Sequence, residues 1–370
     1  MAKEKRNKSA LSVSKGIEKP PSVNPDGVRP FQNRRKTRIS PAGFLEGILN
    51  RNISYLSQAI TLIESSLEEH RDLASELVEA CLPFSGNSMR IGITGVPGVG
   101  KSTFIESFGG MLTGRGERIA VLAVDPSSTL SRGSILGDKT RMEKLSADPN
   151  AFIRPSPSGG SLGGVAGKTR ESIILCEAAG YGTILIETVG VGQSETAVKS
   201  MVDFFLLLML AGAGDELQGI KRGIMEMADL LVITKADGNN VDRAGIARAQ
   251  YERALRLFPP ASSGWKPGVQ TCSAVTGEGL GDIYDSLEKY KGLTQKSGFF
   301  FSNRREQSLY WMHESIERQL TGGFYNDPRI SEELEILRQD VVRGRISSQK
   351  AAGQVLKKYF ESIAVPRKGS

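Results

Sequence analysis

The sequence contains few cysteines and histidines, and this scarcity excludes several kinds of site. Its three cysteines, Cys81, Cys176 and Cys272, lie far apart and lack the spacing typical of metal ligands. With only two histidines, His70 and His313, a structural zinc site is not expected. Scattered cysteines are typical of a reducing intracellular compartment. We therefore expect a cytoplasmic protein.

Long apolar runs are also missing. No stretch reaches the roughly 18 consecutive apolar residues that a membrane-spanning helix needs. The longest candidate, Phe204–Leu210, lies between Asp203 and Gly212, and its length is typical of a buried parallel strand. The sequence therefore predicts no membrane span and no membrane partner.

The net positive charge comes from the beginning of the chain. Residues 1–40 carry eleven Lys/Arg and three Asp/Glu, a net +8, whereas the whole chain of 370 residues carries +7. The remainder is close to neutral, which argues against a nucleic-acid partner. Prolines and many charges predict a basic, disordered tail over residues 1–40. The alternative is an organellar targeting segment, and hence the mitochondrial matrix, although Glu4 and Glu18 are atypical of one.

Hydrophobic periodicity divides the rest of the chain into three parts. Residues 41–86 have apolar side chains at helical spacing, interrupted by Pro83 and Gly86, which predicts an N-terminal helical arm. Residues 87–292 alternate short apolar runs with helical segments. Residues 293–370 lack strand signals and form a candidate dimerisation element. They predict charged, amphipathic helices at residues 303–320 and 331–361, separated by a break at residues 321–328.

The central part has the pattern of an α/β fold. Its apolar runs predict strands at Arg90–Val96, Arg118–Asp125, Ala151–Pro155, Thr183–Thr188, Phe204–Leu210, Leu230–Thr234 and Val269–Ser273. Because helical segments separate most of these runs, we predict a mostly parallel, doubly wound sheet with helical extensions at both ends.

A glycine-rich segment follows the first of these strands. It has the form Gly-x-x-x-x-Gly-Lys-Ser, between an apolar run and a helix, which is the context that a phosphate-binding P-loop requires. Backbone N–H groups and the helix N-terminus would surround the phosphates, and the lysine would supply a positive charge. The residues expected to bind nucleotide here are Gly95, Gly98, Val99, Gly100, Lys101, Ser102 and Thr103.

Acidic residues at the ends of two other strands predict a magnesium site. Ser102 offers a hydroxyl, and Asp125 and Glu187 follow apolar strands, where ligands gather in open α/β sheets. Asp138, in the glycine-rich stretch 133–140, is a further candidate from a mobile loop. We expect Lys101, Glu187 and Asp138 to be catalytic.

A second motif predicts guanine specificity. Thr234-Lys235-Ala236-Asp237 follows a strand and is similar to the Asn-Lys-x-Asp element of GTPases. The Asp237 carboxylate can accept hydrogen bonds from guanine N1–H and from its exocyclic amine, a pair that adenine lacks. Thr234 stands where Asn is usual, and a hydroxyl offers fewer hydrogen bonds than an amide. We expect this difference to affect affinity for the nucleotide more than specificity for guanine. Ser273-Ala274 is similar to the element whose backbone contacts the guanine oxygen.

Several longer segments resemble one known family, the MeaB/ArgK-type GTPases associated with methylmalonyl-CoA mutase. The resemblance covers residues 41–330. It rests on the residues 121–128, 154–157, 162–166, 187–195 and 212–221. Gly190, three residues after Glu187, resembles the glycine whose N–H senses the γ-phosphate.

The resemblance implies a homodimeric, Mg²⁺-dependent P-loop GTPase. Such a protein would be a chaperone for an adenosylcobalamin-dependent acyl-CoA mutase, guarding cofactor loading and replacing damaged cofactor. By the same resemblance, residues 133–141 are similar to switch I, 187–195 to switch II, and 212–221 to an additional switch that relays nucleotide state to the mutase.

Two questions stay open at the level of sequence. The residue that orients the attacking water is not identified: Gln193 lies in the switch II region, and the alternative is charge stabilisation by Lys168 and Arg170. Low intrinsic turnover is expected. The alternatives in function are a metal-insertion GTPase, for which the expected His/Cys-rich stretch is missing, and a regulatory G-protein with a partner other than a mutase.

Overall fold

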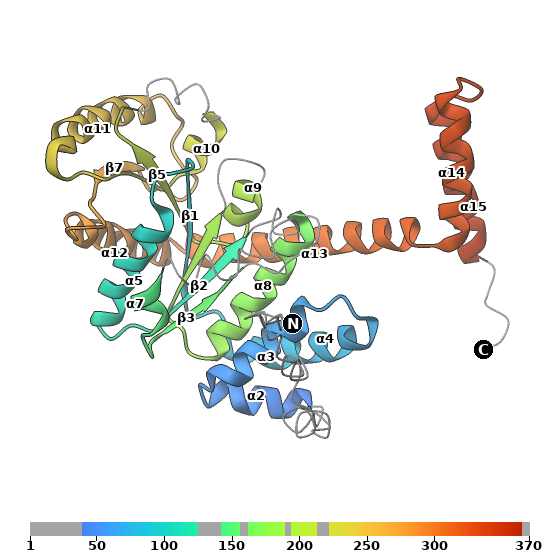
Figure 1. Cartoon of the computed structure of the whole chain (residues 1–370), viewed down its shortest axis with the longest axis horizontal. Helices are drawn as coiled ribbons and strands as arrows, with labels where there is room; N and C mark the ends of the chain where they lie inside the picture. Colours follow the sequence, from blue (N-terminus) through green and yellow to red (C-terminus); the bar gives the residue numbers. More distant parts are fainter. Residues whose placement is uncertain (1–38, 125–141, 156–161, 189–193, 213–221, 365–370) are drawn as a thin grey trace, which may run out of the picture. The chain divides into compact units, whose positions relative to one another are not determined.

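The protein is described by a computed structural model that covers residues 39–124, 142–155, 162–188, 194–212 and 222–364. The strands are β1 (Met89–Gly95), β2 (Ile119–Val124), β3 (Ala151–Arg154), β4 (Thr183–Thr188), β5 (Phe204–Leu210), β6 (Leu230–Thr234) and β7 (Gly268–Thr271). They form one seven-stranded sheet in the order β3-β2-β4-β1-β5-β6-β7, with parallel pairing throughout. Figure 1 shows this sheet with helices packed around it. The predicted α/β fold is confirmed.

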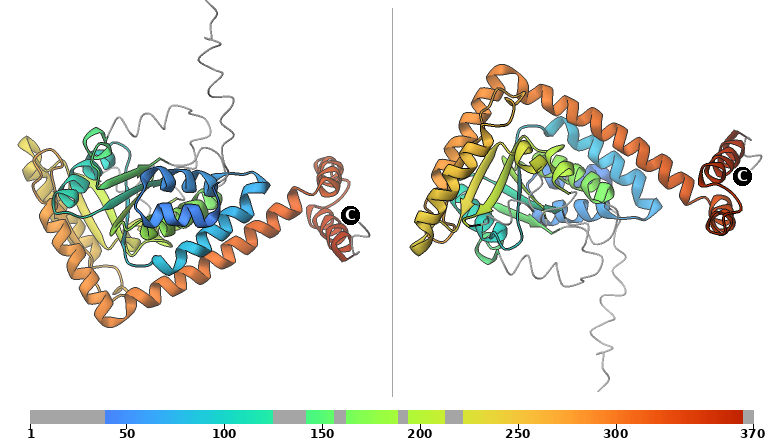
Figure 2. Two further views of the ribbon diagram at one scale, coloured as in Figure 1. Left: turned by 90° about the horizontal axis from the view of Figure 1, so that it is seen from below. Right: turned by 90° about the horizontal axis from the view of Figure 1, so that it is seen from above.

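Helices cover both faces of the sheet (Figure 2). They include α5 (Lys101–Gly114), α7 (Glu143–Ser146), α8 (Leu162–Ala178), α9 (Ser194–Lys199), α10 (Arg222–Met227), α11 (Val241–Leu255) and α12 (Leu280–Ser297), with a 3₁₀ turn at Gly238–Asn240. Phe104 and Phe108 of α5 share a core cluster with Ile91 and Ile93 of β1. Burial of such side chains from water stabilises the layered arrangement.

Gly92 shows why the opposite face of β1 accepts α9 at close range. A Cβ atom at this position would lie 2.8 Å from the ring of Phe205 and 2.9 Å from the side chain of Val198 in α9. Strand residues alternate between faces, so Gly92 points away from the side on which Ile91 and Ile93 meet α5. A larger residue would push α9 away from the sheet.

The helical pattern of residues 41–82 folds as three helices and not as one. They are α2 (Pro41–Leu49), α3 (Ile53–Glu64) and α4 (Glu68–Cys81), followed by a 3₁₀ turn at Leu82–Phe84. Asn52 begins α3 because its Oδ1 accepts a hydrogen bond from Ser54 N at 3.0 Å. The three helices pack on one another and on α8.

The C-terminal helices differ from the predicted pattern. They are α13 (Phe299–Tyr325), α14 (Pro328–Val342) and α15 (Ser348–Ala364). The expected break at residues 321–328 is therefore helical as far as Tyr325, and residues 331–361 form two helices. Gly344, with φ 70°, ends α14 where a continuous helix was expected. The boundary expected at residue 292 falls inside α12, which turns sharply into α13 at Gly298, with φ 79° (Figure 2).

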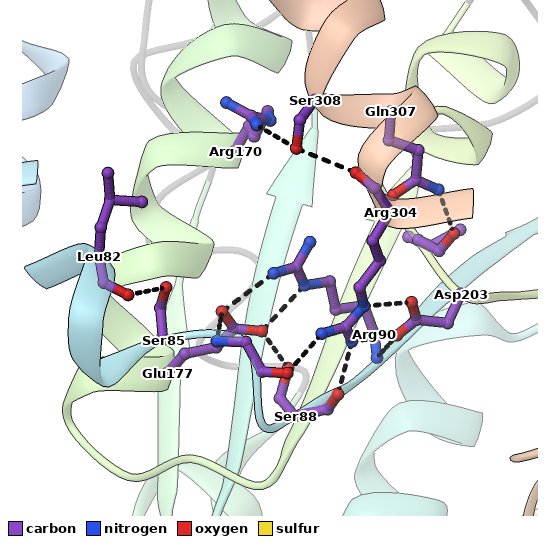
Figure 3. A network of polar contacts seen from close by, with 12 residues as sticks. Leu82, Ser85, Ser88, Arg90, Arg170, Glu177, Asp203, Arg304, Gln307 and Ser308 are labelled. Atoms are coloured by element: carbon purple, nitrogen blue, oxygen red, sulfur yellow. Dashed lines mark hydrogen bonds and ion pairs between the residues drawn. The ribbon is translucent and has the colours of Figure 1, made fainter. Parts of the chain in front are cut away.

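A buried polar network anchors α13 to the amino ends of β1 and β5 (Figure 3). Arg304 donates to both carboxylate oxygens of Asp203, at 2.7 and 2.6 Å, and to the carbonyls of Gly86 and Ser88, each at 2.6 Å. Arg90 pairs with Glu177 at 2.9 Å in the same network. Among the described residues, no helix is long and apolar enough to cross a membrane.

Candidate nucleotide-binding site

The loop between β1 and α5 has the backbone geometry that its glycines permit. A Cβ atom at Gly95 would lie 2.5 Å from the carbonyl oxygen of Leu208 in β5, so a side chain cannot fit there. Gly98 and Gly100 have φ angles of 77° and 93°, which residues with a side chain rarely adopt. The loop therefore turns tightly into the N-terminus of α5, as phosphate binding requires.

Lys101 lies over this loop. Its Nζ donates to the carbonyl of Gly95 at 2.9 Å, which holds the ammonium group against the first residue of the loop. Burial lowers the pKa of Lys101, while the carboxylates of Glu187 and Glu195 act in the opposite direction. The charge is therefore partly desolvated, and a desolvated cation interacts more strongly with an anion than one in water.

Glu187 reaches the phosphate loop from the neighbouring strand. It pairs in register with Ile93 of β1, close to the carboxyl end of β4. The hydroxyl of the next residue, Thr188, donates to the hydroxyl of Thr94 at 2.8 Å. This bond fixes the ends of β4 and β1 to each other. Glu187 and Lys101 are thus brought to one edge of the sheet.

The donor set at this edge fits magnesium. Ser102 is in the first turn of α5, and Glu187 lies half-buried at the end of β4. Hydroxyl and carboxylate oxygens are the ligands that Mg²⁺ takes, with water and phosphate completing the shell. The other expected site residues, Asp125, Asp138 and Gly190, lie outside the described residues. Within the described ranges, no three His, Cys, Asp or Glu side chains form a metal-holding group of their own.

The base motif is hydrogen-bonded to the phosphate loop. The hydroxyl of Thr234, at the end of β6, donates to the carbonyl of Val99 at 2.8 Å. The next residue, Lys235, has φ 57° and donates from Nζ to the carbonyl of Gly98 at 2.9 Å. Thr234 is therefore a support for the phosphate loop, which accounts for a short hydroxyl side chain at a position where Asn is usual.

Asp237 lies beside the loop that follows β7. The hydroxyl of Ser273 donates to Asp237 Oδ2 at 2.5 Å and accepts from the N–H groups of Val275 and Thr276 at 3.2 and 3.1 Å. The carboxylate is thereby oriented. Ala274 is the residue after Ser273, so the two predicted base elements are adjacent in space.

Of the three residues considered for assisting hydrolysis, the two proposed to stabilise charge, Lys168 and Arg170, are bonded to other partners. Lys168 donates to the carbonyls of Glu64 and Ser65 at the end of α3. Arg170 donates to the hydroxyl of Ser308 in α13 at 3.3 Å. Both lie on α8, and these contacts join α8 to the helices on either side of it. The third candidate, Gln193, lies outside the described residues.

Sequence reasoning missed two residues of the site. Burial lowers the pKa of Lys101, and Glu195, buried in α9, opposes this shift. Only its place eight residues after Glu187 could have suggested this. Ser107 donates to the carbonyl of Ala274 at 2.6 Å. It is six residues beyond Lys101 on the same helix, and no local pattern connects it to a residue 167 positions away.

A P-loop at the carboxyl edge of a parallel sheet, with a Lys-x-Asp element and a Ser-Ala loop beside it, defines a P-loop GTPase. The chain belongs to one family of that class, since residues 56–328 match the family described as methylmalonyl-CoA mutase-associated GTPase MeaB. The family predicted from the sequence is thus confirmed.

Individual relatives agree with this assignment. A probable GTPase of Mycobacterium bovis is 49% identical over 301 residues, covering 81% of this chain and 90% of that protein. A mouse protein, the mitochondrial methylmalonic aciduria type A homolog, is 46% identical, covering 85% of this chain and 78% of its own length. A crystal structure described as an LAO/AO transport system kinase is 36% identical with a TM-score of 0.69, covering 86% of this chain and 97% of that one.

Proposed function

We propose that this chain is a slow, Mg²⁺-dependent GTPase and a chaperone for an adenosylcobalamin-dependent acyl-CoA mutase of the methylmalonyl-CoA mutase type. It would gate cofactor loading and protect or reactivate the mutase. The observation that supports this proposal is the match of residues 56–328 to the mutase-associated GTPase family. The joined phosphate and base elements support the choice of GTP as substrate.

The described residues have distinct roles in this proposal. Lys101 would stabilise negative charge on the β- and γ-phosphates, and backbone N–H groups of the loop would hold their oxygens. Ser102 and Glu187 would hold Mg²⁺, directly or through water. When bound, Mg²⁺ would neutralise charge that develops on the phosphate oxygens. Asp237 would accept hydrogen bonds from guanine N1–H and the 2-amino group.

We also propose that the protein forms a homodimer through residues 293–370. Several large apolar side chains on these helices are exposed, including Phe301 at 53%, Leu320 at 61%, Val342 at 82% and Phe360 at 64%. In a dimer, a second copy of the chain would cover these apolar side chains. Residues 41–86 would form a helical arm, residues 87–292 the GTPase domain, and the location would be the cytoplasm.

The partner assignment is tested by GTP turnover with and without a purified adenosylcobalamin-dependent methylmalonyl-CoA mutase. We expect the mutase to accelerate hydrolysis by about tenfold or more, because a partner can order switch segments around the γ-phosphate. The Lys101→Ala variant controls for contaminating phosphatase. Unaccelerated turnover with this mutase and with other adenosylcobalamin-dependent acyl-CoA mutases would leave a GTPase with a different partner.

A further inference from the structure

Helix α5 contacts the base loop as well as the phosphate loop. Its first turn carries Lys101 and Ser102, and Ser107 lies about 9 Å further along the helix axis. The Ser107 hydroxyl donates to the carbonyl oxygen of Ala274 at 2.6 Å, and the contact is partly buried. This bond ties the helix that begins at the phosphates to the loop expected at the guanine oxygen.

Most backbone N–H groups of this loop donate to acceptors within the loop. The N–H of Ser273 donates to the carbonyl of Glu278, and that of Gly277 donates to the carbonyl of Ser273. The N–H groups of the two residues after Ala274 donate to the Ser273 hydroxyl. In the described part of the chain, the N–H of Ala274 has no acceptor, although its neighbours on both sides do.

A backbone N–H without a protein acceptor is available to donate to a ligand. Ala274 is half-buried, and it lies in sequence directly beside Ser273, which holds Asp237. The available N–H and the Asp237 carboxylate therefore lie next to each other as one donor and one acceptor. This pair is complementary to the edge of a 6-oxopurine, where the oxygen accepts and the neighbouring N1–H donates.

We propose that Ser107 is a positioning residue for this recognition. By fixing the carbonyl of Ala274, its hydroxyl orients the loop so that the Ala274 N–H meets the 6-oxo group of the nucleotide. The inference rests on the proposed function, because it takes a guanine nucleotide as the ligand. It assigns the oxygen to Ser107 and Ala274 and leaves the N1–H and 2-amino groups to Asp237.

This division of roles predicts a loss of affinity that differs between nucleotides, which a general loss of stability would not produce. If Ser107 acts through Ala274 alone, its loss affects nucleotides that carry a 6-oxo group and spares those whose 6-position accepts poorly. Recognition of the 2-amino group by Asp237 stays as it was. A loop that merely loosens would weaken all nucleotides alike.

The experiment measures equilibrium dissociation constants of GDP, 6-thio-GDP, IDP and ADP for the full chain and its Ser107→Ala variant. We expect GDP and IDP to lose about three- to tenfold in affinity, the effect of one hydrogen bond. Because sulfur accepts weakly, 6-thio-GDP should lose less than about twofold. The ratio of GDP to 6-thio-GDP affinity therefore falls, and the ratio of GDP to IDP stays constant.

Two variants serve as controls. Ser107→Thr keeps a hydroxyl and should retain the ratios of the unaltered protein. Thr113→Val removes another hydroxyl of α5, which donates to Gly110 inside the helix at 3.2 Å, and should leave all ratios unchanged. Equal losses for GDP and 6-thio-GDP in Ser107→Ala would overturn the inference. An unaltered protein that binds ADP as tightly as GDP would instead overturn the guanine specificity on which the inference rests.

Discussion

The hydroxyl of Thr234 lies 2.8 Å from the carbonyl oxygen of Val99, so the base motif is hydrogen-bonded directly to the phosphate loop. Both partners are buried, with Thr234 3% exposed and Val99 fully enclosed. A second bond, from Lys235 Nζ to the carbonyl of Gly98, joins the same two segments. The two halves of the nucleotide site therefore hold each other in place.

Replacing Thr234 by Val should weaken nucleotide binding without changing nucleotide preference. The variant keeps the shape of the side chain but leaves the Val99 carbonyl without its donor, which corresponds to about three- to tenfold in GDP affinity. Preference for GDP over ADP should remain because Asp237 is unaltered. Isothermal titration calorimetry measures both, and Thr234→Ser, which keeps the hydroxyl, should stay close to the unaltered protein. A loss of preference in Thr234→Val would assign base reading to this residue.

Replacing Lys101 by Ala should lower GTP turnover by about 10²–10³-fold, as loss of a preorganised charge partner does. The reason is the position of its ammonium group at the phosphate loop, 2.9 Å from the carbonyl of Gly95. Phosphate release under saturating GTP gives the turnover number. Lys289→Ala, at an exposed position of α12, is the control and should retain full activity. Unchanged turnover in Lys101→Ala would place the active site elsewhere.

Removal of Mg²⁺ by EDTA should abolish hydrolysis, and adding it back should restore the rate. In Ser102→Ala, the Mg²⁺ concentration for half-maximal turnover should rise by about tenfold or more, because an oxygen ligand has been lost. The measurement is a Mg²⁺ titration of phosphate release. The same midpoint in Ser102→Ala and in the unaltered protein would show that this hydroxyl takes no part in holding the ion.

Replacing Arg304 by Ala should lower the free energy of unfolding by about 3 kcal/mol, because it leaves the buried carboxylate of Asp203 without its ion-pair partner. Arg304 and Asp203 are 12% and 2% exposed, and the pair anchors α13 to the sheet. Denaturant titration measures the change. Arg338→Ala, which breaks an exposed pair with Glu335, should cost less than about 0.5 kcal/mol. Similar effects of the two variants would mean that the Arg304 network contributes little.

The strands were the most predictable part of the fold. The runs at 183–188, 204–210 and 230–234 form β4, β5 and β6 with the bounds predicted, because a strand covered on both faces is apolar along its whole length. The helix ends were less predictable. A break was predicted at residues 321–328, but helix α13 continues to Tyr325.

The site was predictable where one motif supplies adjacent residues, and less so where distant segments meet. The P-loop, Asp237 and Ser273 follow from local patterns at strand ends. The bond between Ser107 and Ala274 joins positions 167 residues apart and has no local signature. The role of Thr234 was also hidden, since its partner Val99 lies 135 positions earlier. Such contacts depend on the register of the sheet.

The central claim is that the site selects guanine through Asp237, whose Oδ2 is held by the Ser273 hydroxyl at 2.5 Å. The most direct test is the set of dissociation constants of GTP, ATP and XTP for the unaltered protein and for Asp237→Asn. We expect the unaltered protein to prefer GTP to ATP by about 10³-fold or more, since a site built for hydrogen bonds rejects ligands that lack them. In Asp237→Asn, the preference should move from GTP to XTP, because the amide donates where the carboxylate accepted. Equal affinity of the unaltered protein for GTP and ATP would contradict the account.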